Sequence, residues 1–94
     1  MDIKYILQDK MSFSIFCRFA NKLIDDGMND VAYNLTDLKE TDKPEFHYAE
    51  FYNSDETMQI IIDNEEINMI GIDMTYAMEC YSFLMTLIDK ESNK

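Results

Sequence analysis

Two side chains of this sequence could together form a nucleophilic pair. Cys80 would be reactive if an imidazole lowered the pKa of its thiol, and His47 is the one histidine in the chain. Cys80 lies, however, in the middle of an apolar stripe at helical spacing, where thiols are usually inert packing groups. No Gly-rich phosphate loop accompanies the pair, because Gly27 and Gly71 stand alone. The sequence therefore predicts a protein that is not an enzyme and has no catalytic residue.

The residue types that bind metals are also poorly arranged for that chemistry. The acidic segments at residues 25–27 and 63–66 lack the alternating ligands and central glycine of a calcium loop. Cys17 and Cys80 are far apart and form no CxxC motif, so we expect two reduced thiols and no structural zinc. The sequence predicts neither a metal nor another cofactor.

The net charge is the most unusual property of the chain. Nineteen Asp and Glu side chains against eight Lys and Arg give a net charge of −11 and a pI near 4.2 over 94 residues. Such a charge repels nucleic acids and anionic membranes and attracts basic surfaces. We therefore expect no direct nucleic-acid binding and no membrane contact. The N-terminal segment has no apolar signal-peptide region, which predicts an intracellular protein.

The acids are concentrated in the second half of the sequence. Residues 44–89 hold ten of them and not one Lys or Arg, whereas residues 1–43 carry eight acids against six bases. A rigid array of carboxylates could occupy a protein site that recognises DNA phosphates with Lys and Arg. The candidate phosphate-mimicking acids are Glu45, Glu50, Asp55, Glu56, Asp63, Glu65, Glu66 and Asp73. The alternative is that the acids only keep a small protein soluble.

The elements that must position these acids belong to a single predicted domain spanning residues 1–94. A helix is predicted from Ser12, a good N-cap, to just before Gly27, which suits the left-handed residue after a helix. Its apolar stripe is Phe13, Phe16, Cys17, Ala20, Leu23 and Ile24. Residues 30–39 fit either a short helix or a strand, and a short helix is slightly favoured.

Three strand-like runs follow that ambiguous segment. They extend over residues 45–52, 56–63 and 67–73. Turn residues separate them, which indicates an antiparallel meander. In the first run Phe46, Tyr48 and Tyr52 share one face, and Phe51 lies on the other. The expected fold class is α+β, with a small antiparallel sheet of about three strands packed with two main helices.

A second strong helix is predicted over residues 75–90. Its apolar stripe is so wide that a sheet of three short strands covers only one side of it. The excess indicates either a second helix packed against it or a second copy of the chain, and a second copy would make an isologous dimer. The predicted dimer interface is Tyr76, Cys80, Tyr81, Leu84, Met85 and Ile88.

In size, acidity, richness in Asn, Asp, Ile, Met and Lys, and α+β patterning, the sequence resembles the Arn family of phage-encoded anti-restriction proteins. The resemblance covers the whole chain in character and rests on no short motif. It implies an acidic DNA mimic without catalytic residues. The implied target is a host DNA-binding protein, the modified-cytosine-dependent restriction endonuclease McrBC. The resemblance also implies a homodimer that acts in the host cytoplasm and protects phage DNA.

Two other kinds of protein fit the same sequence. One is an anti-CRISPR-type inhibitor of a DNA-binding effector, which would share the small size and the acidity. The other is an antitoxin-like or adaptor protein that binds its partner through an apolar surface. That surface would be the Met-rich final helix or the aromatic strand with Phe46, Tyr48, Phe51 and Tyr52. Salt separates charge mimicry from apolar contact, because only mimicry weakens steeply with ionic strength.

Overall fold

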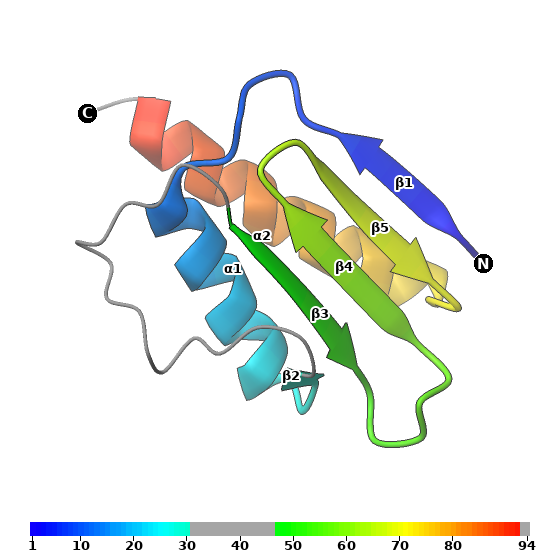
Figure 1. The fold of residues 1–94 in the computed structure, drawn as a ribbon. Helices are drawn as coiled ribbons and strands as arrows, with labels where there is room; N and C mark the ends of the chain where they lie inside the picture. Colours follow the sequence, from blue (N-terminus) through cyan, green and yellow to red (C-terminus); the bar gives the residue numbers. More distant parts are fainter. Residues whose placement is uncertain (31–46, 93–94) are drawn as a thin grey trace.

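The computed structural model describes residues 1–30 and 47–92 (Figure 1). In chain order the elements are β1 (Ile3–Ile6), α1 (Phe13–Asp25), β2 (Asn29–Asp30), β3 (Tyr48–Tyr52), β4 (Gln59–Asp63), β5 (Glu66–Ile70) and α2 (Met74–Ser92). Both helices lie on the same face of one antiparallel sheet (Figure 1). The predicted α+β class is confirmed for the described part of the chain.

In the part of the chain that the structure describes, the sheet has five strands in the order β1-β5-β4-β3-β2, so the prediction of about three strands is wrong. The three predicted runs correspond to β3, β4 and β5 and form the expected meander. β1 has only four residues and pairs with the distant β5, so its alternation of Ile3 and Tyr5 is a weak signal by itself. β2 is two polar residues that join the sheet only through β3, and no periodicity identifies it.

The first helix, α1, forms where the sequence predicts it. The Ser12 hydroxyl accepts a hydrogen bond from the Ile15 backbone N–H (3.2 Å), and Gly27 adopts a φ of +98° just beyond the helix. The buried side chains are Phe13, Ile15, Phe16, Phe19, Ala20 and Leu23. The apolar stripe is therefore turned slightly from the predicted one, which leaves Cys17 half-buried and Ile24 exposed.

The second helix, α2, begins after Asp73, whose carboxylate accepts a hydrogen bond from the Tyr76 backbone N–H (2.8 Å). It continues to Ser92, slightly further than predicted. The helix packs beside α1, and the rings of Phe19 and Phe83 meet between the two helices. Of the two predicted covers for the wide apolar stripe, the structure thus supplies a second helix.

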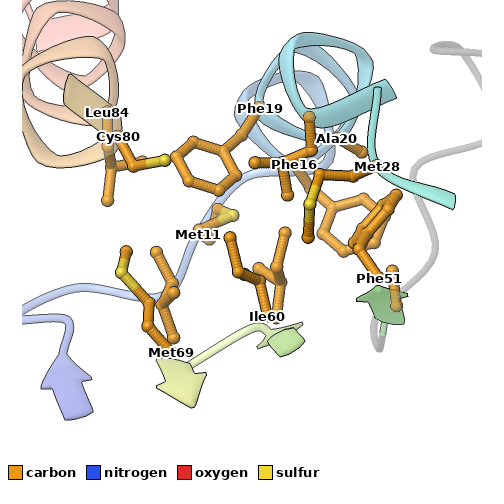
Figure 2. Close-up of a cluster of buried hydrophobic side chains, with 14 of the residues drawn as sticks. Met11, Phe16, Phe19, Ala20, Met28, Phe51, Ile60, Met69, Cys80 and Leu84 are labelled. Atoms are coloured by element: carbon orange, nitrogen blue, oxygen red, sulfur yellow. The ribbon is translucent and has the colours of Figure 1, made fainter. Parts of the chain in front are cut away.

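The hydrophobic core lies between the two helices and the inner face of the sheet (Figure 2). Phe16 and Phe19 of α1 are fully buried there, as is Phe51 of β3. Cys80 and Leu84 complete the cluster from the side of α2 (Figure 2). These contacts join residues from both halves of the sequence, so the described residues share one core.

The two faces of the sheet carry different side chains. The inner face buries apolar side chains of the three central strands: Ala49, Phe51, Ile60, Ile62, Ile67 and Met69. The opposite face, which we call the open face, has no described helix over it and carries the alternate residues: Tyr48, Glu50, Tyr52, Gln59, Ile61, Asp63, Glu66, Asn68 and Ile70. Phe51 thus lies opposite Tyr48 and Tyr52, as the alternation predicts.

Gly71 ends the third predicted run earlier than expected. Its φ of +68° is a left-handed conformation that residues with a Cβ rarely adopt. A Cβ at this position would also overlap the carbonyl oxygen of Thr57, in the turn between β3 and β4. The strand therefore stops at Ile70 rather than at Asp73. Of the ambiguous segment 30–39, only residue 30 lies within the described residues.

Candidate functional site

Three of the predicted acids lie on the open face, one on each central strand. Glu50 is on β3, Asp63 ends β4 and Glu66 begins β5. The strand register places Glu50 opposite Ile61 and Asp63 opposite Tyr48. Acids therefore alternate with apolar and aromatic side chains across this face.

Two of these acids have partners on the same face. Glu50 accepts a hydrogen bond from the Gln59 side-chain amide (2.9 Å). Glu66 forms an ion pair with Lys4 (3.3 Å) and accepts a hydrogen bond from the Asn68 amide (3.1 Å). Because Lys4 belongs to β1, the sheet brings a cation into a region whose own sequence has none. The acidic array is thus partly neutralised on the open face.

The turn between β3 and β4 presents Asp55 and Glu56, both exposed. Asn53 holds this turn, because its side-chain oxygen accepts hydrogen bonds from the backbone N–H groups of Thr57 and Met58, both at 2.9 Å. Glu56 has a φ of +57°, a left-handed conformation that costs free energy for a residue with a Cβ. Within the described residues, neither carboxylate has a hydrogen-bond or ion-pair partner.

The turn between β4 and β5 is held in the same way by Asp63. Its Oδ1 atom accepts hydrogen bonds from the backbone N–H groups of Glu65 and Glu66, both at 2.8 Å. Glu65 is exposed, and no residue in the described ranges bonds to its side chain. Asp63 is therefore a structural acid of this turn, and Glu65 is the acid that the turn presents.

The remaining predicted acids have other positions. Asp73 caps α2, and Glu45 lies outside the described residues. Among the predicted acids that the structure describes, only Asp55, Glu56 and Glu65 have no side-chain partner in residues 1–30 and 47–92. We call these three the turn acids. Sequence patterns could not separate them from the others, because the separation depends on hydrogen bonds made only in the fold.

The turn acids lie at opposite ends of β4 (Figure 1). A five-residue strand spans about 17 Å, the rise of about five phosphates along one DNA strand. Residues 47–89 contain no Lys or Arg, so neither turn has a cation of its own. The geometry therefore presents negative charges beyond both ends of β4, separated by about the length of this strand or more.

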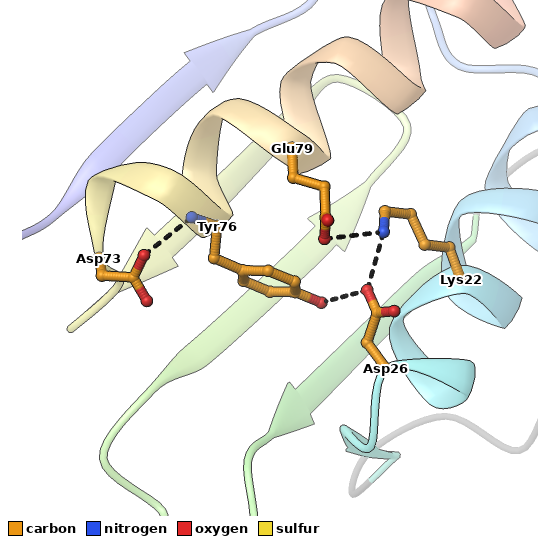
Figure 3. Close-up of polar contacts among 5 residues, drawn as sticks. All are labelled: Lys22, Asp26, Asp73, Tyr76 and Glu79. Atoms are coloured by element: carbon orange, nitrogen blue, oxygen red, sulfur yellow. Dashed lines mark hydrogen bonds and ion pairs between the residues drawn. The ribbon is translucent and has the colours of Figure 1, made fainter.

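A second polar cluster joins the two helices (Figure 3). Lys22 of α1 donates hydrogen bonds to Asp26 (2.8 Å) and to Glu79 of α2 (3.1 Å). The Tyr76 hydroxyl also donates to Asp26 (2.8 Å). The Lys22 ammonium stands over the rings of Tyr76 and Phe83, and its side chain is only 12% exposed. The cluster therefore links α1 to α2 at the edge of the core.

The protonation states of this cluster suit a structural role. Burial acts to lower the pKa of Lys22, but the hydrogen bonds to Asp26 and Glu79 outweigh it and raise that pKa. Burial and the bond to Asp26 raise the pKa of Tyr76 well above its usual value. Burial would raise the pKa of Asp26, but the bonds from Lys22 and Tyr76 lower it. None of these shifts moves a group toward neutral pH, where a general acid or base would titrate.

Cys80 and His47 have different surroundings. Cys80 is buried in the core, and burial raises the pKa of its thiol to about 11, so the thiolate is scarce at neutral pH. The His47 ring packs against Phe16, with the ring centroids 4.5 Å apart. Burial lowers the pKa of His47, against the opposing effects of the Met11 backbone and Asp63. The described contacts therefore provide no activated thiolate–imidazole pair.

The six residues predicted for a dimer interface are divided between core and surface. Cys80 and Leu84 are buried within the single chain, so their side chains are already covered. The half-buried ones are Tyr76, Met85 and Ile88. Tyr81 is 49% exposed and is the most accessible of the six. The homodimer itself stays a prediction.

Comparisons of the chain with protein-family models, with curated proteins and with solved structures found no match in any of the three. Within residues 1–30 and 47–92, no group of three or more His, Cys, Asp or Glu is placed to hold a metal ion. None of the described helices is long and apolar enough to cross a membrane.

Proposed function

We propose that the protein is a phage-type inhibitor that occupies the DNA-binding site of a host defence enzyme. The expected target is the modified-cytosine-dependent restriction endonuclease McrBC, and the effect is protection of phage DNA in the host cytoplasm. The turn acids carry the proposal, because these carboxylates have no side-chain partner among the described residues and are held at both ends of one strand. In the complex they would take the positions of phosphates on Lys and Arg side chains of the target.

The rigidity of the two turns supports this role. Asn53 and Asp63 each accept two backbone hydrogen bonds and hold the turns before any partner arrives. A preorganised group loses little conformational entropy when it binds, which favours tight inhibition. Acidity that served only solubility would not require carboxylates on braced turns.

The conformation of Glu56 supports it further. Asn or Gly would adopt its left-handed φ of +57° at lower cost, yet the position carries an acid. Strained residues in proteins are concentrated at functional sites, where the strain is kept because the side chain is needed. We therefore assign Glu56 a central position in the contact with the target.

The proposal is tested by DNA cleavage with purified McrBC on methylated DNA. Addition of the protein should inhibit cleavage, and excess duplex DNA or higher salt should relieve the inhibition, because both compete with a charge-based contact. The triple variant Asp55→Lys, Glu56→Lys and Glu65→Lys should weaken inhibition by about a hundredfold or more. Its unfolding should remain cooperative, since all three side chains are exposed.

A matched control separates the site from total charge. Asp9→Lys, Asp25→Lys and Asp89→Lys reverse three exposed acids outside the two turns and change the net charge by the same amount. This control should still inhibit within about threefold to fivefold of the original protein. Equal loss in both triple variants would show that the site assignment is wrong. Absence of inhibition by the unchanged protein would eliminate McrBC as the target.

A second candidate function is favoured by the exposed apolar side chains of α2. The exposed fractions of Met74, Met78 and Tyr81 are 55%, 62% and 49%. A cluster of exposed apolar side chains on one helix is typical of a surface that binds a partner. They support the adaptor alternative, in which a partner binds through apolar contact. The aromatic strand is a poorer candidate for that contact, because Phe51 is fully buried. Phe46 lies outside the described residues.

A further inference from the structure

An apolar cavity of about 220 Å³ opens between α2 and the edge of the sheet formed by β1 and β5. Side chains from all three elements line it, including Ile3, Tyr5, Ile67, Met69, Met78 and Tyr81. An apolar cavity of about 150 Å³ already admits benzene. This cavity can therefore take one aromatic or large aliphatic side chain.

The exposed side chains of α2 lie along this cavity. Met74, Met78 and Tyr81 are spaced by four and three residues and so share one face of the helix. All three also belong to the cavity lining. Methionine-rich surfaces adapt their shape to different apolar partners. The cavity and these side chains together form what we call the β1–α2 groove.

The strand beside this groove is an edge of the sheet in the described part of the chain. The Leu7 N–H bonds to the Glu65 carbonyl in the register that pairs β1 with β5. Because hydrogen-bonded positions alternate along an antiparallel pair, the odd-numbered residues of β1 bond to β5. The backbone N–H and C=O groups of Lys4 and Ile6 consequently point away from the sheet, where another strand can pair with them.

The charge of the chain disfavours a second copy as the occupant of this edge. Each copy carries a net charge of −11, so two copies repel one another. Asp2 bonds to the Gly71 N–H beside the start of β1, and Asp73 immediately precedes α2. Each of these acids is next in sequence to a residue that lines the cavity, Ile3 or Met74. A basic segment is attracted where an acidic one is repelled.

We propose that the β1–α2 groove binds an extended segment of a partner protein, which adds to β1 as a sixth strand. Alternate apolar side chains of the segment would enter the groove, and Lys or Arg would accompany them. The proposal deepens the adaptor function and does not depend on the turn acids, which lie in the strand connections rather than along this groove. The protein would then have two separate contact surfaces, one charged and one apolar.

The test begins with selection of random peptides, displayed on phage, against the full chain. Enriched peptides should carry apolar residues at every second position together with Lys or Arg. Synthetic copies should bind in fluorescence anisotropy. N-methylation at the peptide residues that face β1 should weaken binding about tenfold, since it removes hydrogen-bond donors, and methylation at the alternating residues should not. This measurement leaves the protein itself unchanged.

Two variants and a control locate the contact. Ile6→Pro removes an outward N–H without removing a bond to β5 and should weaken binding about tenfold. Met78→Asp places a charge at the apolar mouth and should weaken it about a hundredfold. Ile24→Asp changes an exposed apolar residue of α1 outside the groove and should leave binding unchanged. Thermal unfolding of each variant confirms that it is folded.

Three results would overturn the proposal. Peptides with apolar residues at helical spacing, insensitive to N-methylation, would show that the groove takes a helix. Concentration-dependent dimers that Met78→Asp abolishes would show that a second copy occupies it. Failure to enrich any peptide that responds to Met78→Asp would show that the groove is not a docking site. The triple variant of the turn acids should still bind the selected peptides, so this test fails or succeeds independently of the inhibitor function.

Discussion

The inner and open faces of the sheet are made by alternate residues of the same strands, yet the inner face packs against the helices and the open face carries charged side chains. On β4, Ile60 and Ile62 are fully buried against the helices, while Ile61 between them is half-exposed. The inner face thus fixes how the layers pack. The open face and its turns have few packing constraints and can carry charge.

This difference explains how so acidic a chain can fold. Burial of apolar area drives folding, and it is concentrated on one face of the sheet and on the helices above it. The turn acids stand in exposed connections, where a carboxylate stays hydrated at little cost. Stability and charge therefore reside in different parts of the molecule.

The largest effect should come from the inner face of β3. Phe51→Ala removes a fully buried ring and should lower the free energy of unfolding by about 3–5 kcal/mol. Tyr52→Ala, the neighbouring change on the open face, should cost about 1 kcal/mol or less. Urea unfolding of both variants measures the difference. Similar losses would mean that the open face is covered more than the structure shows.

A smaller effect is expected at the brace of the β3–β4 turn. Asn53→Ala leaves the Thr57 and Met58 N–H groups without their side-chain acceptor and should cost about 1–2 kcal/mol of stability. The same variant should inhibit the target severalfold less, because Asp55 and Glu56 become mobile. Asn68→Ala is the control, since within the described residues its amide bonds to a side chain and not to the backbone. An unchanged inhibition constant for Asn53→Ala would contradict the role of rigidity.

The buried histidine should produce a pH dependence of similar or smaller size. Because burial lowers the pKa of His47 from 6.5, the folded protein excludes a proton that the unfolded chain binds as the pH falls through 6.5. The contribution of neutral His47 to the free energy of unfolding is fully present above pH 6.5. At lower pH the free energy of unfolding should decrease by at most about 1.4 kcal/mol per pH unit. Urea unfolding at about pH 7.5 and about pH 5.5 measures this loss. His47→Phe should remove that part of the pH dependence; an unaltered slope would exclude His47 as its source.

The smallest effect is expected for the one ion pair of the open face between described residues. Lys4 and Glu66 are both partly exposed, so Lys4→Gln should change stability by about 0.5 kcal/mol or less. Removal of this cation should, however, strengthen inhibition slightly, because it leaves the acidic face less neutralised. A double-mutant cycle with Glu66→Gln isolates the pair. A coupling energy well above about 1 kcal/mol would show that the open face contributes more to stability than we infer.

Local features of the chain were predictable from sequence. The Ser12 cap, the Gly27 terminus and the meander of β3, β4 and β5 depend on neighbouring residues or on strict alternation, and the structure confirms them. β1 was not predictable in this way, because Ile3–Ile6 gains its partner from a strand some 60 residues away. The omission of β1, together with that of the two-residue strand β2, is why the predicted number of strands was too low.

The candidate site was predictable only in outline. The cation-free stretch identified which region is acidic, but Asp63 and Asp73 are used by the fold itself, as a turn brace and a helix cap. Glu66 is paired with Lys4, which alternation alone could not reveal. The β1–α2 groove could not be predicted either, because its lining comes from β5 and α2 together with β1, which is far from both in the sequence. The wide apolar stripe of α2 was the one sequence feature that indicated an apolar surface there.

The close contact at Gly71 couples the two proposed surfaces, so that a change in one affects the other. Its bare Cα lies against Thr57, just after the acidic tip of one turn, and α2 with its exposed Met74 begins three residues later. Any side chain larger than hydrogen would push the turn and the helix start apart. Mutations that lengthen or reshape the turn between β3 and β4 would therefore also change the mouth of the β1–α2 groove. A graft of either surface onto another protein would therefore have to include Gly71.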